Sequence, residues 1–124
     1  MTIKEVSEKY EISQDTLRYY ERVGMIPPVT RTASGIRDYQ ESDLGWVELA
    51  KCMRSAGLPV EAMIEYVKLT QEGDATIPAR LQLLKEQRES LLEQKEKINA
   101  TLECLNYKIG CYELAAETGV LTWE

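Results

Sequence analysis

SQDTLRYYER, residues 13–22, is the stretch that decides the fold, because it predicts a short helix with one apolar and one polar face. Ser13 suits the N-cap, since its hydroxyl can accept a hydrogen bond from a free N–H of the first turn. Ile12 and Leu17 can form a hydrophobic staple across this start, and Gly24 is typical of a residue just past a helix end. The polar face carries Gln14, Asp15, Arg18, Tyr19 and Arg22. A helix this short is marginal alone, so we expect another element to support it.

The residues before this stretch predict the supporting helix. Thr2 and Glu5 have the spacing of a capping box, and apolar side chains recur at helical spacing through residues 3–10. Two short helices with so brief a connection form a helix-turn-helix, whose second helix lies in the DNA major groove. The same pattern also occurs in small helical domains that do not bind DNA.

A small hairpin, or wing, is predicted next. The proline pair at 27–28 cannot continue a helix, and residues 29–32 and 36–39 predict two short strands around a turn at 33–35. Guanidinium groups match phosphate geometry, and the hairpin carries two of them beside a tyrosine: Arg31, Arg37 and Tyr39. The alternative is a solvated edge hairpin whose charges only keep the protein soluble.

Composition limits the possible functions. The 124 residues suit one compact domain, or a small domain with an extension. Histidine is absent, which removes the commonest general base and a common metal ligand, and we expect neither an enzyme nor a cofactor. The three cysteines, an odd number, fit a reducing compartment better than a disulfide framework. Residues 1–20 resemble no signal peptide, and no run approaches the ~20 apolar residues of a membrane span, so we expect a cytoplasmic protein.

Net charge is −6, but its distribution matters more for DNA binding than its sum. Residues 1–40 are neutral overall, whereas residues 41–72 and 73–124 each have a net charge of −3. The first third is therefore the least acidic part. An acidic protein can still bind DNA through basic groups on one face, because charges further away than about 8 Å are screened.

Three more helices are predicted. The third runs from about residue 41 or 42 to 56, with Ser42 as a cap and an apolar stripe of Trp46, Leu49, Ala50, Met53 and Ala56. The fourth opens at Pro59 and turns Val60, Met63, Ile64 and Val67 inward. A long helix begins at about Thr76. Its apolar side chains alternate at spacings of four and three, which predicts a coiled-coil seam.

The seam has eleven positions, of which nine are apolar: Ile77, Leu81, Leu84, Arg88, Leu91, Lys95, Ile98, Leu102, Leu105, Ile109 and Tyr112. Arg88 and Lys95 would be costly if fully buried, so we expect their charged ends to reach water. So short a chain offers no partner for the stripe, and we therefore expect a homodimer.

The combined motif resembles the MerR family of bacterial transcription activators. It comprises LRYYER at 17–22, Gly24-Met25-Ile26, Pro28, Arg31, Gly35-x-Arg37-x-Tyr39, Asp43-Leu44 and Arg54-x-x-Gly57-Leu58. The resemblance implies a mainly α fold, with a winged helix-turn-helix DNA-binding domain at residues 1–72. A dimerisation helix that forms an antiparallel coiled coil, with a short tail, follows at 73–124. Such a dimer would bind double-stranded promoter DNA. It would distort the spacer between the two promoter elements, so that RNA polymerase can bind both.

The resemblance also suggests which residues contact DNA. We expect Arg18 and Tyr19 from the second helix, Arg31, Arg37 and Tyr39 from the wing, and Arg54 from the third helix. Tyr20 and Lys51 are further candidates. Tyr20 could equally pack behind its helix because it follows Leu17 by three positions, and Lys51 could lie on a solvated face.

Cys52 is the candidate effector site. Metal-sensing members carry a cysteine at the start of the long helix and two more in a loop near its end, whereas here Cys104 and Cys111 lie within the helix. The chain instead resembles the NmlR/AdhR branch, which controls aldehyde and nitrosative stress genes and has one thiol at the Cys52 position. We therefore expect Cys52 to sense an electrophile such as an aldehyde. The simpler alternative is that it only packs as a small side chain.

Two other functions remain open from the sequence. The protein could be a metal- or oxidant-responsive member of the same family. It could also be a coiled-coil adaptor that binds protein rather than DNA, which the acidic total favours. Retention on promoter DNA that weakens as salt rises would distinguish a regulator from an adaptor.

Overall fold

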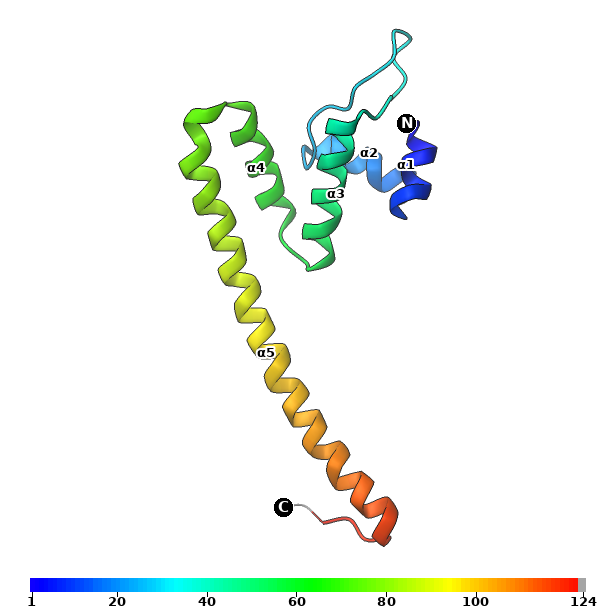
Figure 1. The fold of residues 1–124 in the computed structure, drawn as a ribbon, viewed down its shortest axis with the longest axis vertical. Coiled ribbons are helices and arrows are strands. Elements are labelled where there is room, and N and C mark those ends of the chain that lie inside the picture. Colours follow the sequence, from blue (N-terminus) through cyan, green and yellow to red (C-terminus); the bar gives the residue numbers. More distant parts are fainter. Residues whose placement is uncertain (123–124) are drawn as a thin grey trace. The chain divides into compact units, whose positions relative to one another are not determined.

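The computed structural model describes residues 1–122, and most of them lie in helices (Figure 1). The elements are α1 (Ile3–Tyr10), α2 (Gln14–Val23), α3 (Glu41–Ser55), α4 (Val60–Gln71), a 3₁₀ turn η1 (Asp74–Thr76) and α5 (Ile77–Thr118). The prediction of a mainly helical chain with a long last helix is confirmed. The chain divides into two compact units, Met1–Gln87 and Arg88–Glu124. The first unit therefore includes the start of α5.

The starts of α1 and α2 match the capping predictions. The Thr2 hydroxyl accepts a hydrogen bond from the Glu5 N–H at 3.1 Å, and the Glu5 carboxylate accepts one from the Thr2 N–H at 3.0 Å. The Ser13 hydroxyl accepts a hydrogen bond from the Thr16 N–H at 3.1 Å. Gly24 ends α2 at a φ of 89°, a left-handed conformation that glycine adopts without a steric penalty.

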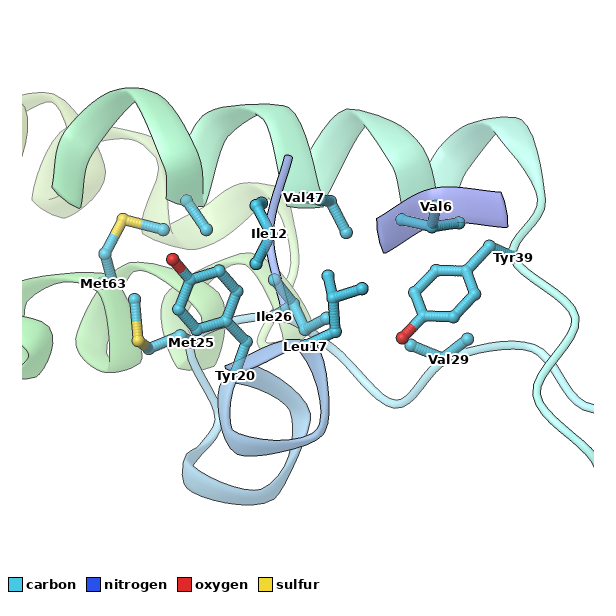
Figure 2. Close-up of a cluster of buried hydrophobic side chains, with 11 residues drawn as sticks. Val6, Ile12, Leu17, Tyr20, Met25, Ile26, Val29, Tyr39, Val47 and Met63 are labelled. Atoms are coloured by element: carbon cyan, nitrogen blue, oxygen red, sulfur yellow. The ribbon is translucent and has the colours of Figure 1, made fainter. Parts of the chain in front are cut away.

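One hydrophobic core holds the first unit together (Figure 2). Its buried members are Val6, Ile12, Leu17, Tyr20, Met25, Ile26, Val29, Tyr39, Val47, Ala50 and Met63. Both staple residues, Ile12 and Leu17, belong to it. The stripe predicted for α3 is partly wrong, because Val47 is fully buried and Ala56 is exposed. The reason is that packing around α3, rather than its own spacing, decides which of its side chains are covered.

The wing differs from its prediction. Within residues 1–122 the structure has no regular strand, and the predicted strand pair is reduced to one antiparallel bridge between Arg31 and Arg37. Two backbone hydrogen bonds flank this bridge, from the Thr32 N–H to the Ile36 carbonyl at 2.8 Å and from the Asp38 N–H to the Thr30 carbonyl at 2.7 Å. An isolated hairpin of this size is marginal in water, so side chains from other elements must hold it.

Asp43 is one of them. The predicted start of α3 is correct, but Gln40 rather than Ser42 is the N-cap residue. The buried Asp43 carboxylate accepts hydrogen bonds from the Gln40 N–H at 2.8 Å and from the Thr30 N–H at 3.4 Å. A single carboxylate therefore joins the beginning of α3 to the first arm of the wing.

The turn between α4 and α5 is held by side chains. The Thr76 hydroxyl lies 2.6 Å from the Leu69 carbonyl oxygen, and the Arg80 guanidinium donates hydrogen bonds to the Thr76 hydroxyl and the Gly73 carbonyl. Thr76 therefore lies just before α5, which starts at Ile77.

Helix α5 is 42 residues long, and most of the predicted seam is exposed within this single chain. The exposed seam residues are Ile77, Leu81, Arg88, Leu91, Lys95, Ile98, Leu102, Leu105, Ile109 and Tyr112. Leu84 is half-buried. None of the helices within residues 1–122 is long and apolar enough to cross a membrane.

Candidate nucleic-acid interface

Helix α2 presents a polar face on the first unit. The Arg18 guanidinium donates hydrogen bonds to the Asp15 carboxylate at 3.1 Å and to the Gln14 side-chain oxygen at 3.4 Å. The Arg22 guanidinium lies over the exposed Tyr19 ring, with its central carbon 5.5 Å from the ring centroid. The helix therefore carries two guanidinium groups and an aromatic ring on one surface, and these are groups that bind nucleic acid.

The other two candidate tyrosines lie inside the unit (Figure 2). Tyr20 is 8% exposed and Tyr39 is 1% exposed. Burial raises the pKa of both phenols above its usual range, although the nearby charges of Arg54 and Arg37 respectively oppose the shift. Because both rings form part of the core, the structure does not leave Tyr20 or Tyr39 exposed for the DNA contact expected of them. The sequence motif does not predict this burial, because a tyrosine at either position could pack in the core or face solvent.

Glu21 connects the wing to α2. One of its carboxylate oxygens accepts a hydrogen bond from Arg37 Nε at 2.7 Å and lies 3.5 Å from an Nη of Arg31. The other oxygen accepts a hydrogen bond from the Val29 N–H at 2.7 Å. The side chain of Glu21 is 11% exposed. Both predicted phosphate-binding arginines of the wing therefore meet at a carboxylate on α2.

These donors determine the charge of Glu21. Burial on its own would raise the pKa of the carboxyl, but the Val29 N–H and the Arg37 and Arg31 guanidinium groups outweigh it, so the pKa lies below its ordinary value. Glu21 is therefore ionised at neutral pH. The two arginines leave the cluster with a net positive charge, which suits a polyanionic partner.

Lys51 and Arg54 are exposed on α3, yet both contact backbone carbonyls. Lys51 Nζ donates a hydrogen bond to the Tyr10 carbonyl, which ties α3 to the end of α1. Arg54 donates one to the Leu58 carbonyl, in the loop that leads to α4. Both side chains therefore stabilise the unit while their charges stay at its surface.

Cys52 is exposed on α3. Its carbonyl accepts a hydrogen bond from the Ser55 hydroxyl at 2.7 Å. Cys104 is exposed on α5 and Cys111 is half-buried there. In the part of the chain that the structure describes, no group of three or more histidine, cysteine or carboxylate side chains is arranged to hold a metal ion.

The sequence predictions did not identify the roles of Glu21 and Asp43. The sequence motif contains both residues, but it predicts no contact for either of them. An acidic residue near the end of the recognition helix, followed by two hairpin arginines, could have suggested an ion pair. The spacing alone does not show that both hairpin arginines pair with Glu21, because Arg31 is 10 positions away along the chain and Arg37 is 16.

Comparison with known proteins identifies relatives of the whole chain. Residues 1–70 match the family described as MerR HTH family regulatory protein. The HTH-type transcriptional regulator AdhR of Bacillus subtilis (strain 168) is 54% identical over 93 residues, which cover 75% of this chain and 66% of that protein. A crystal structure of a MerR family transcriptional regulator from Listeria monocytogenes has 43% identity and a TM-score of 0.92, covering 96% of this chain and 90% of that one. HiNmlR, a MerR family regulator lacking the sensor domain and crystallised with promoter DNA, has 32% identity and a TM-score of 0.84, covering 95% and 94%.

Proposed function

Because the chain belongs to the MerR HTH family of regulatory proteins, we propose that it is a transcriptional regulator that binds promoter DNA as a homodimer and responds to a thiol-reactive electrophile. Its relatives are regulators and not enzymes. The observation that carries the proposal is that Glu21 joins the exposed polar face of α2 to a wing bearing two arginines. The crystal structure of HiNmlR with promoter DNA supports the same use of this architecture.

The proposed contacts divide into base reading and phosphate binding. Helix α2 would lie in the major groove, where Arg18 and Tyr19 reach base edges or the adjacent backbone. The wing arginines, Arg31 and Arg37, would bind phosphates, which position a protein on DNA without reading sequence. Lys51 and Arg54 would add positive charge beside the phosphate backbone from α3.

The homodimer would form through α5. Exposed leucine and isoleucine side chains recur along its seam, and a second copy of the helix would remove them from water. An antiparallel pair would place two recognition helices on two half-sites of one promoter. Deformation of the DNA spacer on which the dimer sits, at a cost of a few kcal/mol, would bring the two promoter elements at its ends into register for RNA polymerase.

Cys52 would be the sensor. Its exposed thiol can add to an aldehyde: the S–C bond forms, and the thiol proton passes to the carbonyl oxygen to give a hemithioacetal. Two arguments support this site. Similarity to AdhR places the chain in the NmlR/AdhR branch, and α3 also contributes Val47 and Ala50 to the core of the DNA-binding unit. A group added at Cys52 would therefore act on a helix that the unit depends on.

Transcription in vitro from the promoter upstream of the gene tests the proposal. Wild type and Cys52→Ser are compared with and without formaldehyde, and Cys104→Ser is the control because that thiol is exposed on α5. Activation of wild type and Cys104→Ser, but not of Cys52→Ser, is expected. Equal activation of all three would place the sensor elsewhere and keep the regulator. A promoter that is bound but never activated would exclude aldehydes as the effector class.

A further inference from the structure

We propose that Glu21 is a positioning residue that presents the Arg37 guanidinium to a DNA phosphate. This inference rests on the proposed DNA-binding function and adds a role for an acidic side chain within a surface that binds a polyanion. It concerns the three donors that converge on Glu21, from Val29, Arg31 and Arg37.

The nitrogen atoms of the Arg37 guanidinium differ in their contacts: Nε is bound to Glu21, and the two Nη atoms are not. Its Nε donates to Glu21 at 2.7 Å, whereas neither of its terminal Nη atoms has a hydrogen-bond partner within residues 1–122. The side chain is 23% exposed. Two terminal N–H₂ groups held by an ion pair at Nε form a fork that can receive one phosphate.

Arg31 is placed differently. One of its Nη atoms donates to the Gly35 carbonyl at 3.1 Å, and the other lies 3.5 Å from Glu21, at the limit of a hydrogen bond. Its side chain is 43% exposed. Glu21 therefore holds Arg37 more firmly than Arg31, and the positioning role applies to Arg37.

Positioning reduces the entropic cost of binding. An arginine side chain that moves freely loses rotamer freedom when it binds a phosphate, and this loss weakens binding. Glu21 has already ordered Arg37 before DNA arrives. The Val29 N–H orders Glu21 in turn, so the wing backbone, the carboxylate and the guanidinium form one connected unit.

The sign of the effect separates positioning from simple electrostatics. Removal of a negative charge near the phosphates should strengthen DNA binding if only net charge matters. Glu21→Gln removes that charge and also places an amide N–H₂ where an oxygen accepted a hydrogen bond, so either the Val29 N–H or Arg37 loses its acceptor. If Glu21 positions Arg37, the same substitution should weaken binding.

The experiment measures the dissociation constant for the promoter fragment across a salt series. We expect Glu21→Gln to bind about three- to tenfold more weakly than wild type, with a salt slope lower by up to about one unit. Glu8→Gln, which removes the same charge from an exposed site on α1, is the matched control and should bind at least as tightly as wild type. The double variant Glu21→Gln/Arg37→Ala should bind no more weakly than Arg37→Ala alone.

Arg37→Lys provides a second test that does not depend on the stability of Glu21→Gln. Lysine keeps the positive charge but has only one nitrogen atom. It therefore cannot bind Glu21 through one nitrogen and present two N–H₂ groups to a phosphate, as arginine can. We expect it to bind as weakly as Arg37→Ala, and wild-type affinity would overturn the inference. Equal or tighter binding by folded Glu21→Gln would also overturn it while leaving the proposed function intact. Failure of wild type itself to bind the promoter would instead refute the proposed function.

Discussion

Glu21 Oε1 and Arg37 Nε lie 2.7 Å apart and join α2 to the wing. The two residues are 16 positions apart in the chain, and the carboxylate is largely withdrawn from solvent. A paired charge in such a place stabilises a specific arrangement of elements, whereas removal of one partner leaves the other uncompensated. The wing therefore depends on α2 for its position.

The ion pairs of Glu21 with Arg31 and Arg37 should make the free energy of unfolding depend on pH. The pKa of the folded carboxyl lies below the ordinary value of 4.5, so its contribution is fully present above that pH and is lost as pH falls through the folded pKa. At pH 7 we expect Glu21→Gln to lower the free energy of unfolding by about 1–3 kcal/mol. Urea unfolding at fixed protein concentration should show this difference shrinking as the pH falls below 4.5. A difference that is constant with pH would contradict the ion-pair account.

Arg18→Ala should weaken promoter binding by about 1–3 kcal/mol, because an arginine in the major groove can bond to a base edge through two N–H groups. Fluorescence anisotropy with the labelled promoter fragment would measure it. Lys97→Ala, a change of the same charge on α5 outside the first unit, is the control and should leave affinity unchanged. Unchanged affinity of Arg18→Ala at moderate salt would remove Arg18 from the contact set.

Arg31→Ala should lower the salt slope of binding by about one unit, because one fewer phosphate is neutralised. The same anisotropy titration at several salt concentrations gives the slope. Lys9→Ala removes an exposed charge from α1 and should keep the slope of wild type. An identical slope for Arg31→Ala would mean that the exposed guanidinium reaches no phosphate.

Leu102→Glu should disrupt the dimer, because a carboxylate at the seam would lose its hydration when the two helices meet. Leu102 is exposed in the single chain and lies at a seam position. Leu92 is also exposed on α5 but lies off the seam, so Leu92→Glu should remain a dimer. Sedimentation velocity distinguishes the two species. A dimeric Leu102→Glu would place the interface on another face of α5.

Tyr39→Phe should stabilise the protein by about 1 kcal/mol. The Tyr39 hydroxyl is buried and has no hydrogen-bond partner among the described residues, and an unsatisfied buried polar group costs free energy that phenylalanine avoids. Thermal or urea unfolding would measure the change. A loss of stability would show that the hydroxyl does form a hydrogen bond in solution.

Local features of the candidate site could be predicted from the sequence, whereas its contacts could not. The polar face of α2 follows from helical spacing, so Arg18 and Tyr19 were correctly expected outside. Spacing alone could not decide whether Tyr20 and Tyr39 face solvent, because that depends on which other elements cover them. The partners of Glu21 were not predictable either, since they come from a segment that folds back only in three dimensions.

The sequence by itself determined the elements whose causes lie within a few residues: the capping box of Thr2 and Glu5, the Ser13 cap, the left-handed end at Gly24 and the apolar repeat of α5. Each depends on side chains that are neighbours along the chain, and local hydrogen bonds and spacing suffice to predict it. Only the tertiary structure decided how the wing is held. Its short hairpin lacks the ladder to stabilise itself, so carboxylates from two helices, Glu21 and Asp43, bind its backbone and its arginines. Such contacts arise from burial and charge between distant segments, which no local pattern specifies.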